Sequence, residues 1–95
     1  MNAMQYWQGQ SVELRVLFAD AAGVPLAAGG VAFRVKKPDG ALSTVAASED
    51  PARANEWIGY VVADQAGVWT VKASCSTPRP AVEQQSFTVM ASLPG

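Results

Sequence analysis

The groups in this chain that could do chemistry are acidic side chains and one thiol, because the sequence contains no histidine. A nucleophile activated by histidine and a histidine-ligated metal are therefore excluded. Cys75 is the single cysteine, so it can form neither an internal disulfide nor a thiolate zinc site. It continues the alternating register of Trp69 and Val71, which predicts a small, buried, unreactive side chain.

The carboxylates stand in turn-like surroundings. Glu49 and Asp50 are adjacent, but neighbours on an extended chain point to opposite sides, which favours a solvated loop over a cation site. Asp20 in FADAAG and Asp39 in KPDG are typical turn residues. The AAGG stretch lacks the lysine and hydroxyl of a phosphate-binding loop. We therefore expect no catalytic residue, no cofactor, no metal site and no enzymatic activity.

Composition limits the partners. The chain has 95 residues, 49% of them apolar, and a net charge of −1, which predicts one packed domain and no nucleic-acid partner. Low net charge gives little repulsion between copies, which suits a protein of an assembly. No run approaches the roughly twenty apolar residues needed to span a bilayer, so no membrane association is expected. The start, MNAMQYWQGQ, lacks the pattern of a signal peptide.

Apolar residues alternate with polar ones along most of the chain, which predicts half-buried strands. We expect strands at residues 11–18, 31–37, 41–47, 57–63 and 69–75 and a last one through Phe87 and Val89. The stretch 20–30 is predicted as a loop, KPDG as a hairpin turn, and SEDPARANE (48–56) as an exposed loop with room for one helical turn. Six strands with regular turn signals predict an antiparallel sandwich.

The best-formed motif is ADQAGVWTV, residues 63–71. Asp64 is expected to accept hydrogen bonds from backbone N–H groups of the turn, and Gly67 to adopt a positive φ. The turn then directs Trp69 into the core. The motif therefore predicts a role in folding.

This Asp-x-x-Gly-x-Trp-x-Val pattern resembles the turn-and-strand signature of immunoglobulin-like sandwiches. The order YWQGQSVELRVLFADAAGVPL, VAFRVKKPDG, EWIGYVVADQAGVWTVKAS and FTV, over about residues 6–90, is similar to small immunoglobulin-like virion proteins of tailed bacteriophages and of gene transfer agents. The resemblance implies an all-β fold, a single antiparallel immunoglobulin-like β-sandwich of about six to eight strands. It would occupy residues 10–95, after an extended N-terminal arm at residues 1–9.

The resemblance implies a non-enzymatic virion structural protein that docks on other structural subunits at the head, as capsid decoration or at the head–tail joining region. Its partners would be capsid, head–tail or tail subunits, with homo-oligomers possible on the particle. It would be made in the bacterial cytoplasm without a signal peptide and reside in the virion. One alternative is a carbohydrate- or host-surface-binding module of a tail or fibre, using the loops ARANEW and STPRPAVEQQ; another is an assembly chaperone.

Two segments offer partner-contact residues. The arm contains Met4, Tyr6 and Trp7, and the run WIGYVV contains Ile58 and Tyr60 on the register opposite to Trp57. Large apolar and aromatic side chains of this kind are frequent interface anchors. Two alternatives remain open at this point: the arm folds back as a lid or extra strand, and the run is covered by a neighbouring loop.

Overall fold

The computed structural model describes residues 5–91, which form eight β-strands and no helix. Accordingly, this part of the chain contains no helix with the length and apolarity to cross a membrane. The strands are β1 (Gln5–Trp7), β2 (Ser11–Leu17), β3 (Ala32–Lys36), β4 (Leu42–Ala46), β5 (Ser48–Glu49), β6 (Glu56–Val62), β7 (Gly67–Cys75) and β8 (Ala81–Met90).

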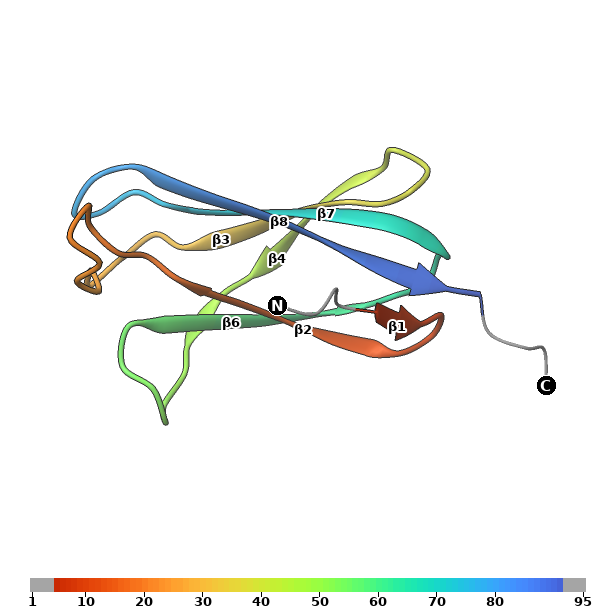
Figure 1. Ribbon diagram of the computed structural model, residues 1–95, viewed down its shortest axis with the longest axis horizontal. Helices are drawn as coiled ribbons and strands as arrows, with labels where there is room; N and C mark the ends of the chain where they lie inside the picture. Colours follow the sequence, from red (N-terminus) through yellow and green to blue (C-terminus); the bar gives the residue numbers. More distant parts are fainter. Residues whose placement is uncertain (1–4, 92–95) are drawn as a thin grey trace.

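The strands form two sheets that stack as layers (Figure 1). One sheet has five strands in the order β1-β8-β7-β3-β4, and the other has three in the order β2-β6-β5. Every pairing is antiparallel except that of β1 with β8, which is parallel. The all-β sandwich expected from the alternating pattern is confirmed.

The core lies between the layers and consists of the inward residues of both sheets. Trp69 is fully buried, stacks on Phe87 with ring centroids 5.7 Å apart, and donates from Nε1 to the carbonyl oxygen of Gln65 at 2.9 Å. This bond satisfies the polar atom of the indole, which would otherwise be costly to bury. The other buried apolar side chains are Val12, Leu14, Val16, Phe18, Phe33, Val35, Ala63, Val71, Ala73, Cys75 and Val89.

The first strand lies within the segment predicted as an N-terminal arm. Residues 5–7 pair with Thr88–Met90 of β8, and Tyr6 packs edge-on against Phe87. Within the segment expected as an arm (1–9), residues 5–7 therefore form an edge strand of the five-stranded sheet, and residues 8–9 form the turn after it. The open alternative of an extra strand is what residues 5–7 adopt.

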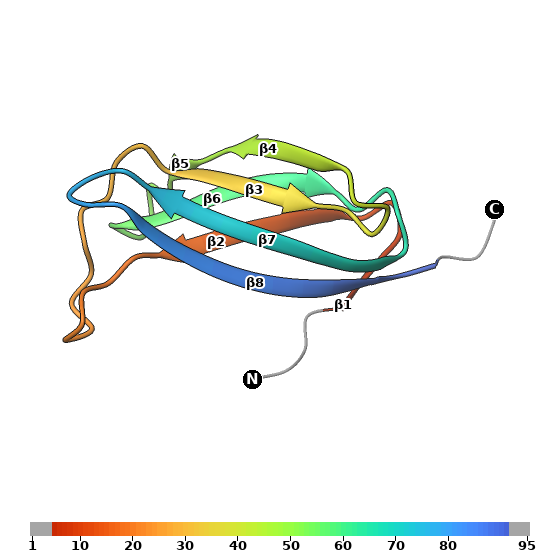
Figure 2. The same cartoon turned by 90° about the horizontal axis from the view of Figure 1, so that it is seen from above.

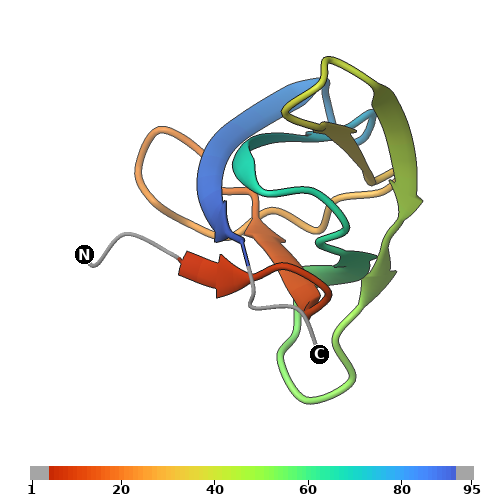
Figure 3. The same cartoon turned by 90° about the vertical axis from the view of Figure 1, so that its right-hand side faces the viewer.

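The chain passes from one sheet to the other between β4 and β5 (Figure 3). Ser48 and Glu49 pair with Ile58 and Trp57 of β6, so the segment 48–56 is not a loop throughout, as predicted, but starts with a two-residue strand. At this crossing Gly59 approaches β4 closely: a Cβ there would lie 2.9 Å from the carbonyl oxygen of Ala46. The absence of a side chain at Gly59 therefore allows this close approach.

The turn before β7 differs from its prediction in one contact. Gly67 has a φ of 129° as expected, and a Cβ there would lie 2.8 Å from Pro38. The carboxylate of Asp64, however, accepts a hydrogen bond from Nζ of Lys37 at 2.9 Å, and Lys37 also lies 5.7 Å from the centroid of the Trp69 ring. The expectation that Asp64 binds backbone N–H groups of the turn is wrong, because the β3–β4 hairpin brings an ammonium group to it.

Candidate interaction surfaces

The outer face of the three-stranded sheet contains the two contact residues predicted on β6. Tyr60 is 59% exposed and lies opposite Glu13 of β2, whereas Ile58 is half-buried opposite Arg15. Trp57 and Val61 pack on the core from the other side of the same strand. The predicted division of this run between two faces is therefore what the register produces.

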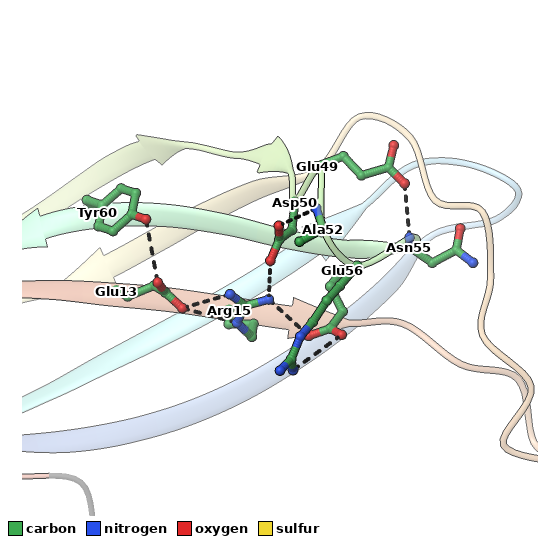
Figure 4. A network of polar contacts seen from close by, with 9 residues as sticks. Glu13, Arg15, Glu49, Asp50, Ala52, Asn55, Glu56 and Tyr60 are labelled. Atoms are coloured by element: carbon green, nitrogen blue, oxygen red, sulfur yellow. Dashed lines mark hydrogen bonds and ion pairs between the residues drawn. The ribbon is translucent and has the colours of Figure 1, made fainter.

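Arg15 is the centre of an ion-pair network on this face (Figure 4). Its guanidinium lies 2.9 Å from Asp50 and 3.0 Å from both Glu56 and Glu13. These carboxylates, Asp50 first, raise the pKa of Arg15. The backbone N–H of Ala52, followed by Arg15, holds the pKa of Asp50 below its ordinary value.

The network anchors the loop after β5 to β2. Its carboxylates accept hydrogen bonds from a guanidinium group, a permanent cation that cannot act as their partner in proton transfer. Within residues 5–91 no group of three or more histidine, cysteine or acidic side chains could hold a metal ion. We interpret this cluster as structural.

The outer face of the five-stranded sheet displays an apolar cluster at the end of β1. Trp7 is 56% exposed and lies opposite Met90, which is 41% exposed. Val68 of β7, 59% exposed, lies on the same face opposite Thr88, which is two residues before Met90 on β8. We call Trp7, Val68 and Met90 the Trp7 patch.

The three residues predicted in the arm have different positions. Trp7 is in this patch, whereas Tyr6 faces the core and is half-buried against Phe87. The pairing of β1 with β8 explains the difference, because successive side chains of a strand point to opposite faces. Met4 lies outside the described residues. Of the pair Tyr6 and Trp7, only Trp7 is therefore exposed at the surface.

A basic hollow of about 360 Å³ lies on the same outer face and is lined by Arg34, Lys36, Leu42, Thr70, Lys72 and Gln84. Arg34 is paired with Lys72 across β3 and β7. Sequence reasoning missed this site, because its cations are not adjacent in the sequence. These cations alternate with apolar residues in VAFRVKK and WTVKAS, which indicates that they lie on the outer side of their strands. Only the pairing of the strands brings them together.

The thiol and the turn carboxylates lie where the sequence placed them. Cys75 is buried, and its Sγ is 3.6 Å from the carbonyl oxygen of Arg79. Asp20 accepts from the backbone N–H groups of Ala22 and Val24, both at 2.9 Å. Asp39 accepts from that of Ala41 at 2.8 Å, which also lowers its pKa. These residues serve the core and the turns.

The fold defines the class of protein, an immunoglobulin-like β-sandwich, and comparisons with solved structures confirm it. The chain is similar to a filamin domain of Lin-41, with a TM-score of 0.62, 20% identity, and coverage of 90% of this chain and 82% of that one. It is also similar to a DUF4785 family protein from Legionella pneumophila, with a TM-score of 0.71 and 12% identity over 95% of this chain.

The chain spans 27% of the length of the Legionella protein. At these identities the likeness concerns the fold alone. No protein-family model matches the chain, and no curated protein matches it by sequence. The immunoglobulin-like sandwich is thus established.

Proposed function

We propose that this protein is a non-enzymatic structural subunit of a phage-type particle. In this proposal it docks on capsid, head–tail or tail subunits at the head or the head–tail joining region, after synthesis in the bacterial cytoplasm. The resemblance to small immunoglobulin-like virion proteins suggests the particle, and the exposed Trp7 patch supports the docking. Many copies of such a module, each making a modest contact, would bridge neighbouring subunits through avidity where they are linked.

Trp7 is the residue that supports the docking most directly. Its ring is more than half exposed, yet its backbone is held by the pairing of β1 with β8. The backbone N–H of Trp7 also donates to Oε1 of Gln10 at 3.1 Å. A large aromatic side chain on an ordered strand loses little freedom on binding, and tryptophan is among the residues most enriched at interface hot spots.

The pair Ile58 and Tyr60 on β6 is a weaker candidate for a contact with a partner. Ile58 is half-buried, and the hydroxyl of Tyr60 lies 3.5 Å from Oε2 of Glu13, within the polar surroundings of the Arg15 network. A partner that bound here would have to remove water from the polar groups around Tyr60, which costs free energy. Around Trp7, by contrast, Val68 and Met90 add apolar surface. The Trp7 patch is therefore the preferred contact.

The test compares Trp7→Ala with Tyr60→Ala in the full chain, produced together with the other structural proteins of its particle. Copy number per purified particle is measured by quantitative mass spectrometry. We expect Trp7→Ala to keep its melting temperature and to lose about tenfold or more in occupancy, since a hot spot contributes about 2 kcal/mol or more. Tyr60→Ala should retain occupancy.

Two results would contradict the proposal. Absence of the wild-type protein from finished particles would favour an assembly chaperone. A specific hit on a glycan array, lost on substitution in the loops ARANEW or STPRPAVEQQ, would favour the carbohydrate-binding alternative. Full occupancy of Trp7→Ala would remove the Trp7 patch from the interface.

A further inference from the structure

Three cations share the outer face of the five-stranded sheet. Arg34 and Lys36 lie on β3, and Lys72 lies on β7 opposite Arg34. Figure 2 shows these two strands side by side. All three are exposed. Within residues 5–91 none of them forms an ion pair, whereas Arg15 and Lys37 do.

The pairing of Arg34 with Lys72 works against the isolated fold. The two are direct cross-strand partners, and like charges in this position destabilise a sheet. The chain as a whole has a net charge of −1, so the repulsion comes from the local arrangement. An unfavourable pair of like charges that no ion pair compensates is typical of a functional surface, where a sequence departs from what stabilises the fold.

The hollow around these residues is rich in hydrogen-bond donors. It combines the guanidinium of Arg34 and the ammonium groups of Lys36 and Lys72 with the hydroxyl of Thr70 and the amide of Gln84. Guanidinium and ammonium groups only donate, so the complementary ligand must supply several acceptor oxygens with negative charge. Guanidinium groups bind carboxylates in a bidentate manner.

The spacing of the cations points to an extended ligand. Arg34 and Lys36 are two residues apart on one strand, a repeat of about 6.8 Å at roughly 3.4 Å per residue. Alternate side chains of an extended peptide repeat at the same distance. We propose that the hollow binds an extended acidic segment of a partner protein, with one carboxylate between Arg34 and Lys72 and the next at Lys36.

A nucleic acid fits the hollow less well. Binding of single strands relies on aromatic side chains that stack on bases, and the lining contains none. Duplex binding typically uses about six to ten phosphate contacts, whereas this surface offers three cations. A short acidic peptide matches both the size and the donor set.

This inference deepens the proposed function, since it names the chemistry of a partner on the same sheet face, and it rests on that function only for the identity of the particle. Its test uses the purified full chain and a free peptide. Failure of peptide binding and failure of particle docking are therefore distinguishable.

The probe is a fluorescent peptide of alternating glutamate and threonine, with a glutamine–threonine peptide as the neutral control, and binding is followed by anisotropy. We expect the acidic peptide to bind at low ionic strength, more weakly at about 0.15 M salt, and the control peptide not to bind. Lys72→Gln and Arg34→Gln should each weaken binding about fivefold, as loss of one ion pair predicts. Arg79→Gln, an exposed cation outside the hollow, should change nothing.

A second readout separates a binding role from a folding role. Because Lys72→Gln removes the repulsion with Arg34, its melting temperature should be unchanged or higher while its affinity falls. No binding of the acidic peptide at low salt would overturn the proposal. Equal loss with Arg79→Gln would mean nonspecific attraction, and tighter binding of an oligothymidylate of equal charge, lost in Lys72→Gln, would identify a nucleic-acid site instead.

Discussion

The ring of Tyr6 meets the ring of Phe87 edge-on, with centroids 5.4 Å apart and planes at 82°. Phe87 in turn stacks on Trp69 with an interplanar angle of 16°. These three rings join the edge strand β1 to the centre of the core. Residues 5–7 are thereby part of the folded unit, although they form a strand of only three residues.

This contact predicts opposite effects for neighbouring aromatic residues. Tyr6→Ala should lower the free energy of unfolding by about 1 to 3 kcal/mol, because it removes an aromatic pair and part of a buried ring. Trp7→Ala should change it by less than about 0.5 kcal/mol, since the ring is exposed. Urea denaturation followed by far-UV circular dichroism measures both, since the fluorescence of the three tryptophans would itself change in Trp7→Ala. Equal losses for the two variants would contradict the assignment of Tyr6 to the core.

Trp69 should be the most costly residue of the core to truncate. It is fully buried, stacks on Phe87 and satisfies its own N–H at Gln65. Trp69→Ala is expected to cost about 3 to 5 kcal/mol, a large part of a typical total stability of about 5 to 15 kcal/mol. Thermal unfolding followed by far-UV circular dichroism should show a folded fraction well below that of Trp7→Ala.

Gly59 is predicted to tolerate no side chain. A Cβ there would lie 2.9 Å from the carbonyl oxygen of Ala46 and 3.0 Å from the Phe33 ring, so β4 and β6 would have to separate. Gly59→Ala should cost about 1 to 3 kcal/mol by overpacking, more than it gains by restricting the unfolded chain. Thr44→Ala, at an exposed position of β4, is the control. A Gly59→Ala variant as stable as wild type in urea would show that the two sheets can move apart here at little cost.

Much of this fold could be predicted from the sequence, because strand alternation is a local property. The inward positions of Val12, Leu14, Trp69 and Cys75 follow from period two alone. Strand β5 was not predicted, and β1 was left open as one alternative for the arm. Two and three residues are too short for a pattern, and both strands depend on pairing, with β6 and β8 respectively.

The basic hollow could not be predicted from the sequence for a related reason. Alternation places Arg34 and Lys72 on outer faces, but no local signal says that β3 and β7 are neighbours. The salt link of Asp64 with Lys37 likewise depends on where a distant hairpin ends. The sequence indicates the arrangement within each strand or turn, but it does not indicate which distant strands and turns come into contact.

The Asp50 carboxylate should make stability depend on acid pH. Its pKa is lowered first by the backbone N–H of Ala52 and then by Arg15, so the unfolded chain binds this proton more tightly than the folded one. The stabilisation is therefore fully present above the unfolded pKa, near 3.9, and is lost as the pH falls through the folded value. In urea titrations between about pH 6 and pH 2, Asp50→Asn should be less stable than wild type near neutrality and should lose less on acidification. Arg15→Gln should keep part of the acid dependence, because the hydrogen bond from Ala52 remains. An Asp50→Asn curve parallel to that of wild type would mean that this carboxylate has no lowered pKa.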